Sequence, residues 1–122
     1  MPQAAIVKQI DHLLVECRDP LALFRLFTET FGLPVTWAFK QFDEFGGVVS
    51  GGVFFGNTDL EFVKFAHTRA TRLHGIGFEP APLDVAISQL ALRTIPARAS
   101  VPYEGTMPNG EYGFMWRNVM LP

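Results

Sequence analysis

Three residues of metal-binding types are candidates for one site: His12, Glu61 and His74. Two imidazoles and one carboxylate suit a divalent first-row ion, and three protein ligands leave positions open for water or substrate. Such an ion could polarise a substrate carbonyl. Ligand type does not select the metal, so Fe, Mn, Ni, Co and Zn all stay open. The alternative is that each His is a hydrogen-bonded structural residue and that Glu61 is the exposed position of an alternating strand.

The two His residues are equivalent in an internal repeat of sixty-two positions. The matched pairs are His12 and His74, Leu14 and Ile76, Pro20 and Pro82, Leu21 and Leu83, Leu33 and Ile95, and Pro34 and Pro96. A repeat of this length indicates one supersecondary unit used twice. It predicts that both His residues lie on the first strand of their unit.

The first strand organises the chain. Residues 10–17 are apolar and β-branched with no Pro or Gly, so side chains alternate between two faces. His12 shares one face with Glu16, while Val15 and Cys17 share the other and are expected to pack against a helix. Cys17 is therefore predicted to be a small buried hydrophobe rather than a reactive thiol.

A helix over 20–31 follows this strand. Asp19 can cap its N-terminus, Pro20 suits the first helical position and Gly32 can end it. Its apolar stripe consists of Leu23, Phe24, Phe27 and Phe31.

The remaining pattern predicts an α+β fold made of two strand-helix-strand-strand-strand modules. The expected strands are 6–17, 33–42, 45–56, 60–65, 73–79, 95–103 and 112–121, with a second helix over 82–93 and a loop over 104–110. Module one spans 6–66, a polar linker 67–72 follows, and module two spans 73–122. His67 in the linker is expected to be a solvated surface residue. Module two lacks its last strand, which the repeat predicts beyond Pro122.

Four glycines fall within the expected strand 45–56: Gly46, Gly47, Gly51 and Gly52. Glycine in a strand indicates bending, a bulge or a close approach to a ligand. The spacing is not that of a phosphate-binding loop.

Length and composition predict one domain over 1–122. The net charge of −2 gives no electrostatic case for nucleic acid or membrane partners. The single Cys excludes an internal disulfide framework. No signal pattern and no long apolar run occur, so a cytoplasmic protein is expected. A homodimer is expected too, because a partner subunit would cover the edge left by the missing strand.

Aromatic residues offer a second kind of site. Trp37, Phe54, Tyr103 and Trp116 could line a cavity for a small organic ligand. The alternative is that they are core residues, as most strand aromatics are.

The chain resembles the vicinal oxygen chelate superfamily, which includes glyoxalase I, extradiol dioxygenases, methylmalonyl-CoA epimerase, and fosfomycin and bleomycin resistance proteins. The resemblance is carried by residues 10–15, 19–20, 31–33, 58–63, 73–78 and 116–119. It implies paired βαβββ modules in a cupped mixed sheet with the helices outside.

The resemblance also maps the family's metal ligands onto His12, Glu61 and His74. It implies a metal-dependent lyase, isomerase or dioxygenase acting on a small oxygenated substrate. The alternatives it leaves are a metal-free, antibiotic-type binding protein that forms a homodimer, and an inactive or truncated module. The glyoxalase-type carboxylate base would come from the strand that this sequence does not contain.

Overall fold

The computed structural model describes residues 5–106 and 110–121, with side chains except at 44, 99–101, 106 and 112–118. The chain divides into two compact units, Val7–Glu79 and the residues after Glu79 with the N-terminal segment. The predicted linker 67–72 lies inside the first unit, which also contains nearly all of the strand that follows it.

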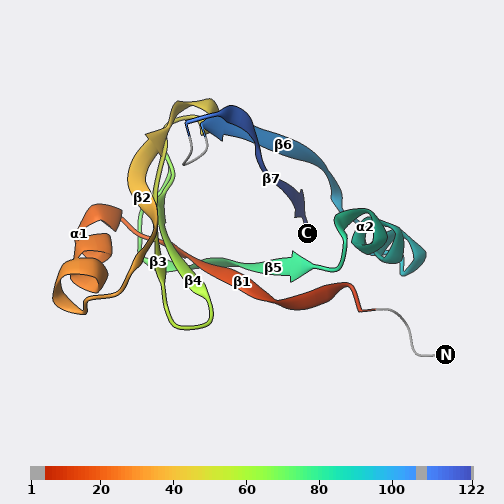
Figure 1. Ribbon diagram of the computed structural model, residues 1–122, viewed down its shortest axis with the longest axis horizontal. Coiled ribbons are helices and arrows are strands. Elements are labelled where there is room, and N and C mark those ends of the chain that lie inside the picture. Colours follow the sequence, from red (N-terminus) through yellow and green to blue (C-terminus); the bar gives the residue numbers. More distant parts are fainter. Residues whose placement is uncertain (1–4, 107–109, 122) are drawn as a thin grey trace. The chain divides into compact units, whose positions relative to one another are not determined.

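The first unit is a five-stranded sheet with a helical segment. Its strands are β1 (Val7–Glu16), β2 (Val35–Phe42), β3 (Val48–Phe54), β4 (Asp59–Lys64) and β5 (Arg72–Pro80), in the order β2-β3-β4-β1-β5. β1 and β4 are parallel, while β2 and β4 are both antiparallel to β3. This mixed sheet has the βαβββ connectivity that the sequence predicts for module one (Figure 1).

The helical segment begins as expected and ends at the expected glycine. Asp19 Oδ1 accepts a hydrogen bond from the Ala22 amide at 3.0 Å, with Pro20 as the first residue of α1 (Pro20–Arg25). The segment then widens into a π-helical turn, Leu26–Thr30, in which the Phe31 amide bonds the Leu26 carbonyl. Gly32 has φ +71°, a left-handed conformation that suits glycine after a helix.

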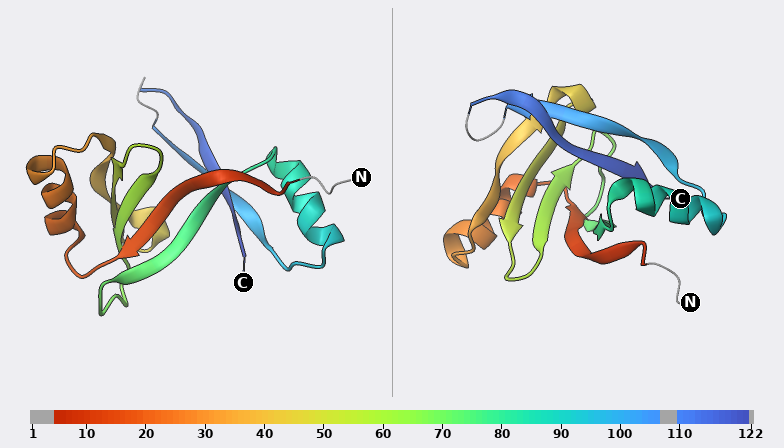
Figure 2. Two further views of the ribbon diagram at one scale, coloured as in Figure 1. Left: turned by 90° about the horizontal axis from the view of Figure 1, so that it is seen from below. Right: turned by 45° about the vertical axis from the view of Figure 1, so that its right-hand side comes forward.

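One face of the sheet, which we call the helix face, packs against α1 and forms the core. Cys17, Val53 and Phe62 are buried there, and Leu23, Phe24 and Phe27 of the helical segment pack on them. Figure 2 shows the helical segment on a single side of these strands. The prediction that Cys17 is a buried hydrophobe on the helix side is confirmed, since it is 1% exposed. The opposite face, which we call the site face, carries His12.

The third strand is shorter than predicted. Residues 43–45 form a 3₁₀ turn, and Gly46 and Gly47 both have positive φ angles, +75° and +80°. These two glycines therefore make the turn between β2 and β3 rather than belonging to the strand. The other two, Gly51 and Gly52, do lie in β3.

The second unit contains α2 (Leu83–Leu92) and an antiparallel pair, β6 (Arg98–Thr106) and β7 (Tyr112–Met120). The expected strand over 95–103 begins later and reaches further, because a turn at Arg93 and Thr94 follows α2 and residues 95–97 form no regular structure. In the described part of the chain, no helix is long and apolar enough to cross a membrane.

Candidate functional site

The parallel pairing of β1 with β4 brings His12 and Glu61 together on the site face. The register pairs His12 with Asp59 and Leu14 with Glu61, so the two side chains are diagonal neighbours. His12 Nε2 lies 3.4 Å from Glu61 Oε2, and the side chains are 24% and 18% exposed. Two of the three predicted ligands are therefore adjacent and partly shielded from water.

Both nitrogens of His12 face carboxylate oxygens. Nδ1 lies 2.7 Å from Asp11 Oδ2, on the side opposite Glu61. Hydrogen bonding to Glu61 is the largest cause that raises the pKa of His12 above its ordinary value of 6.5; Asp11 raises it further, and burial opposes both. A neutral imidazole donates from one nitrogen only, so this arrangement favours either an imidazolium or a cation between Nε2 and Glu61.

The other oxygen of Glu61 is held by a chain of two hydrogen bonds through Trp37, Ser50 and Glu61, which we call the relay. Ser50 Oγ donates to Glu61 Oε1 at 2.7 Å and accepts from Trp37 Nε1 at 3.2 Å. Ser50 is only 2% exposed. With Oε1 engaged in this way, Oε2 is the oxygen that faces His12.

Two glycines make room for the aromatic rings of this site. A Cβ on Gly52 would overlap the Trp37 indole, and a Cβ on Gly77 would overlap the His12 imidazole. The Trp37 and His12 rings meet edge to face with centroids 6.3 Å apart. The glycine in β3 thus permits a close approach, as the sequence predicts, but the group that approaches is a side chain of the protein.

His74 is not part of this pair. Its Nδ1 lies 3.4 Å from Glu16 Oε2, and its ring packs against Phe65 with centroids 4.7 Å apart. Glu16 stands four residues after His12 on β1, roughly 13 Å along the strand. The residue of β5 beside the His12 ring is Gly77, three positions after His74, so His74 lies at the Glu16 end of β1.

The described residues contain no group of three His, Cys, Asp or Glu side chains placed to hold a metal ion. The structure thus joins His12 to Glu61 and places His74 elsewhere. Metal binding by the full set His12, Glu61 and His74 stays a prediction.

The four predicted aromatic residues are divided between the two units. Trp37 is partly buried and donates a hydrogen bond to Ser50. Phe54, on the same face of the sheet, is 43% exposed. Tyr103 is 9% exposed in β6, where its backbone pairs with Trp116 of β7. The side chain of Trp116 lies outside the described residues.

Comparison with known proteins identifies the fold. No protein-family model matches the sequence, and no curated protein matches it. Solved structures do match. The chain has a vicinal oxygen chelate fold. The resemblance predicted from the sequence is therefore confirmed for the fold.

The matching structures include methylmalonyl-CoA epimerases. The Mycobacterium tuberculosis protein gives a TM-score of 0.67 at 13% identity, over 87% of this chain and 77% of that one. A selenomethionine form gives 0.67 at 18% identity, over 90% and 86%. A complex with methylmalonyl-CoA and NH4+ gives 0.65 at 18% identity, over 87% and 82%. Identities this low compare folds, not activities.

Sequence reasoning missed Asp11 and Ser50. Asp11 adjoins His12 in sequence, and a carboxylate behind a ligating His is a common way to fix its tautomer, so that signal was present. Ser50 stands among glycines and carries no spacing signal; only the strand register brings it to Glu61.

The first prediction concerns pH. Because the folded-state pKa of His12 is raised, its protonation stabilises the fold fully below pH 6.5 and progressively less as the pH rises through the raised value. We expect the free energy of unfolding, measured by urea denaturation, to show this decrease in the parent protein and to lose it in His12→Gln. His67→Gln, at an exposed position, is the control. Identical pH profiles for the parent and His12→Gln would contradict the assignment.

The second prediction concerns the space that Gly77 leaves for the His12 ring. Gly77→Ala forces the imidazole to move and should lower the free energy of unfolding by about 1–3 kcal/mol, as overpacking does. It should also change the His12 ring signals in NMR spectra. The matched control is Gly75→Ala on the same strand, where a Cβ meets nothing within 4 Å. Equal effects of the two substitutions would show that the His12 ring does not depend on the absence of a side chain at Gly77.

The third prediction concerns the relay. Ser50→Ala leaves Glu61 Oε1 and Trp37 Nε1 without their shared partner and should cost about 1–3 kcal/mol in thermal or urea unfolding. Ser88→Ala, which removes an exposed hydroxyl from α2, should stay within about 0.5 kcal/mol of the parent. A Ser50 variant as stable as the Ser88 variant would show that the relay contributes nothing.

Proposed function

We propose that this protein is a divalent-metal-dependent enzyme of isomerase type that acts on a small acyl thioester, with His12 and Glu61 as metal ligands. The observation that carries the proposal is the 3.4 Å separation of His12 Nε2 and Glu61 Oε2 on the site face. The acyl-CoA class comes from the epimerases of the same fold, one of which is in complex with methylmalonyl-CoA.

The donor pair fits one edge of a metal coordination sphere. Two ligands at about 2.1 Å from a tetrahedral ion are separated by about 3.4 Å, which matches this pair. The raised pKa of His12 indicates a site that favours positive charge at Nε2. His74 is proposed as the third ligand, and it would have to leave Glu16 to join the pair.

A bound divalent ion would act as a Lewis acid on the substrate carbonyl and so favour proton removal at the adjacent carbon. The chain's own residues prepare that position. Asp11 holds the proton of His12 on Nδ1 and leaves the Nε2 lone pair for the ion. Ser50 engages Glu61 Oε1 and leaves Oε2 for the ion. Trp37 packs edge to face against the imidazole.

A second candidate function is metal-free binding of an aromatic or antibiotic-type ligand. It is favoured by the separation of His74 from His12 and by Phe54, which is 43% exposed on the same face as Trp37. A homodimer is expected under either proposal, and gel filtration measures it.

The test combines metal content with proton exchange. The protein is loaded with Fe, Mn, Ni, Co or Zn, freed of excess ion and analysed for bound metal. It is then incubated with methylmalonyl-CoA in D₂O. We expect near-stoichiometric metal and deuterium at the α-carbon, with exchange lowered at least a hundredfold in His12→Gln and in Glu61→Gln. The control, Arg25→Ala at an exposed position of α1, should match the parent in both.

Absence of bound metal and of exchange with every ion would overturn the proposal. Stabilisation of the metal-free protein by an aromatic ligand, measured as a rise in melting temperature, would then support the second candidate.

A further inference from the structure

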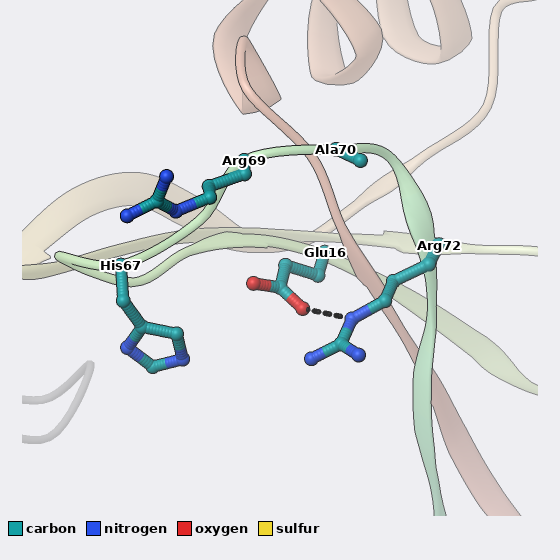
Figure 3. A pocket seen from close by; sticks show the side chains of 5 residues that line it. All are labelled: Glu16, His67, Arg69, Ala70 and Arg72. Carbon is teal, nitrogen blue, oxygen red and sulfur yellow. Dashed lines mark hydrogen bonds and ion pairs between the residues drawn. The ribbon is translucent and has the colours of Figure 1, made fainter.

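A second polar cluster of the first unit surrounds a cavity of about 250 Å³ that does not include His12 or Glu61. Its lining residues come from the end of β1, the segment between β4 and β5, and the start of β5. They are Glu16, His67, Arg69, Ala70 and Arg72 (Figure 3). The chain as a whole has a net charge of −2, so two guanidinium groups around one cavity are a local exception.

Glu16 lies at the base of this cluster and is matched in charge by Arg72. Its side chain is 3% exposed; Oε2 accepts from Arg72 Nε at 2.6 Å and Oε1 accepts from Thr68 Oγ1 at 2.8 Å. The hydrogen bond from Arg72, followed by that from Thr68, lowers the pKa of Glu16 to about 2. The carboxylate is therefore ionised and satisfied, and it fixes Arg72, whose side chain is 61% exposed, at the cavity.

The opposite side of the cavity carries charge that Glu16 does not neutralise. In the view of Figure 3, Glu16 lies between the Arg72 guanidinium and the side chains of Arg69 and His67. Among the described residues, no carboxylate forms an ion pair with Arg69. Arg69 and Arg72 against Glu16 therefore give the cavity an excess of one positive charge.

The backbone and rings around the cavity are held in place by other contacts. Arg18, two residues after the end of β1, donates from Nε to the carbonyl oxygen of Arg69 and so holds this segment against the end of that strand. His67 stacks on Phe65, with centroids 5.7 Å apart and planes 8° apart. Preorganised donors lose less entropy when an anion binds. The exposure of His67 agrees with the prediction from sequence, but it lines a cavity rather than an open surface.

We propose that this cavity binds a phosphate group, with Arg69 as the principal ligand and Arg72 and His67 as further donors. Guanidinium groups bind phosphate oxygens through paired, charge-assisted hydrogen bonds. This inference rests on the proposed function in one respect: the phosphate is assigned to the CoA part of an acyl-CoA substrate.

The positions on β1 favour that assignment. His12 and Glu16 share the site face, four residues and roughly 13 Å apart. An acyl-CoA carries its thioester and its phosphates at opposite ends of a pantetheine arm longer than this when extended. One substrate therefore reaches from the His12–Glu61 pair to the cavity over Glu16.

The test measures binding by calorimetry with three probes: CoA, pantetheine and inorganic phosphate. We expect the parent to bind CoA more tightly than pantetheine, and Arg69→Ala to raise the Kd for CoA about tenfold or more while leaving that for pantetheine unchanged. His67→Ala should give a smaller increase. The control is Arg25→Ala, an exposed Arg on α1 paired with Glu29, which should match the parent. Added salt should weaken CoA binding and reduce the difference between the variants.

The outcomes separate this inference from the proposed function. Parent-like CoA binding by Arg69→Ala would overturn the phosphate site even if proton exchange occurs. Equal affinities for CoA and pantetheine, with no Arg69-dependent binding of inorganic phosphate, would overturn it as well. Inorganic phosphate binding that depends on Arg69, without any preference for CoA over pantetheine, would overturn the assignment to substrate. Arg69-dependent CoA binding in a protein that catalyses no proton exchange would support the phosphate site and contradict only the proposed isomerase activity.

Discussion

The structure of the first unit depends on the parallel pairing of β1 with β4. A parallel pair requires a crossover, and here the crossover contains the helical segment and the β2–β3 hairpin. The helical segment covers one face of the sheet with Leu23, Phe24 and Phe27, so that face becomes the core. The other face then carries His12 of β1 and Glu61 of β4. Because the pairing is direct, residues forty-nine positions apart in the chain, His12 and Glu61, become neighbours.

Glycine is used where side chains would otherwise collide. On the helix face, a Cβ on Gly51 would overlap Phe39 and Phe24; on the site face, one on Gly52 would overlap Trp37. Consecutive glycines thus let bulky rings lie against both faces of one strand. Glycine has a lower β-propensity than larger residues, so this close packing weakens β3. Pairing with β2 on one side and β4 on the other holds the strand in the sheet.

The sequence predicts the features that follow from local rules. Alternation along β1, the Asp19 cap, the Gly32 stop and the helix stripe each depend on residues a few positions apart. The structure has all of them, except that Phe31 of the predicted stripe is 59% exposed and does not pack on the core. Glu61 was found because its strand alternates and resembles a known ligand strand. The partner of His74 was not found, since it depends on which carboxylate comes closest across strands β1 and β5. The repeat gives equivalent backbone positions to His12 and His74 but says nothing of that competition.

His12 and His74 each have a carboxylate partner, yet the two partners differ in a way that separates their roles. Glu61 accepts from Ser50 and faces His12 across 3.4 Å, with the pair 18–24% exposed. Glu16 is 3% exposed and already accepts from Thr68 and Arg72 before His74 is counted. A carboxylate whose charge is matched by a guanidinium has little left to offer a metal ion, whereas one held by a hydroxyl keeps its charge. The Glu61 end of the site face therefore suits a cation and the Glu16 end, with Arg69 and Arg72, suits an anion. That polarity along β1 is what a substrate with a reactive carbonyl at one end and phosphate at the other requires.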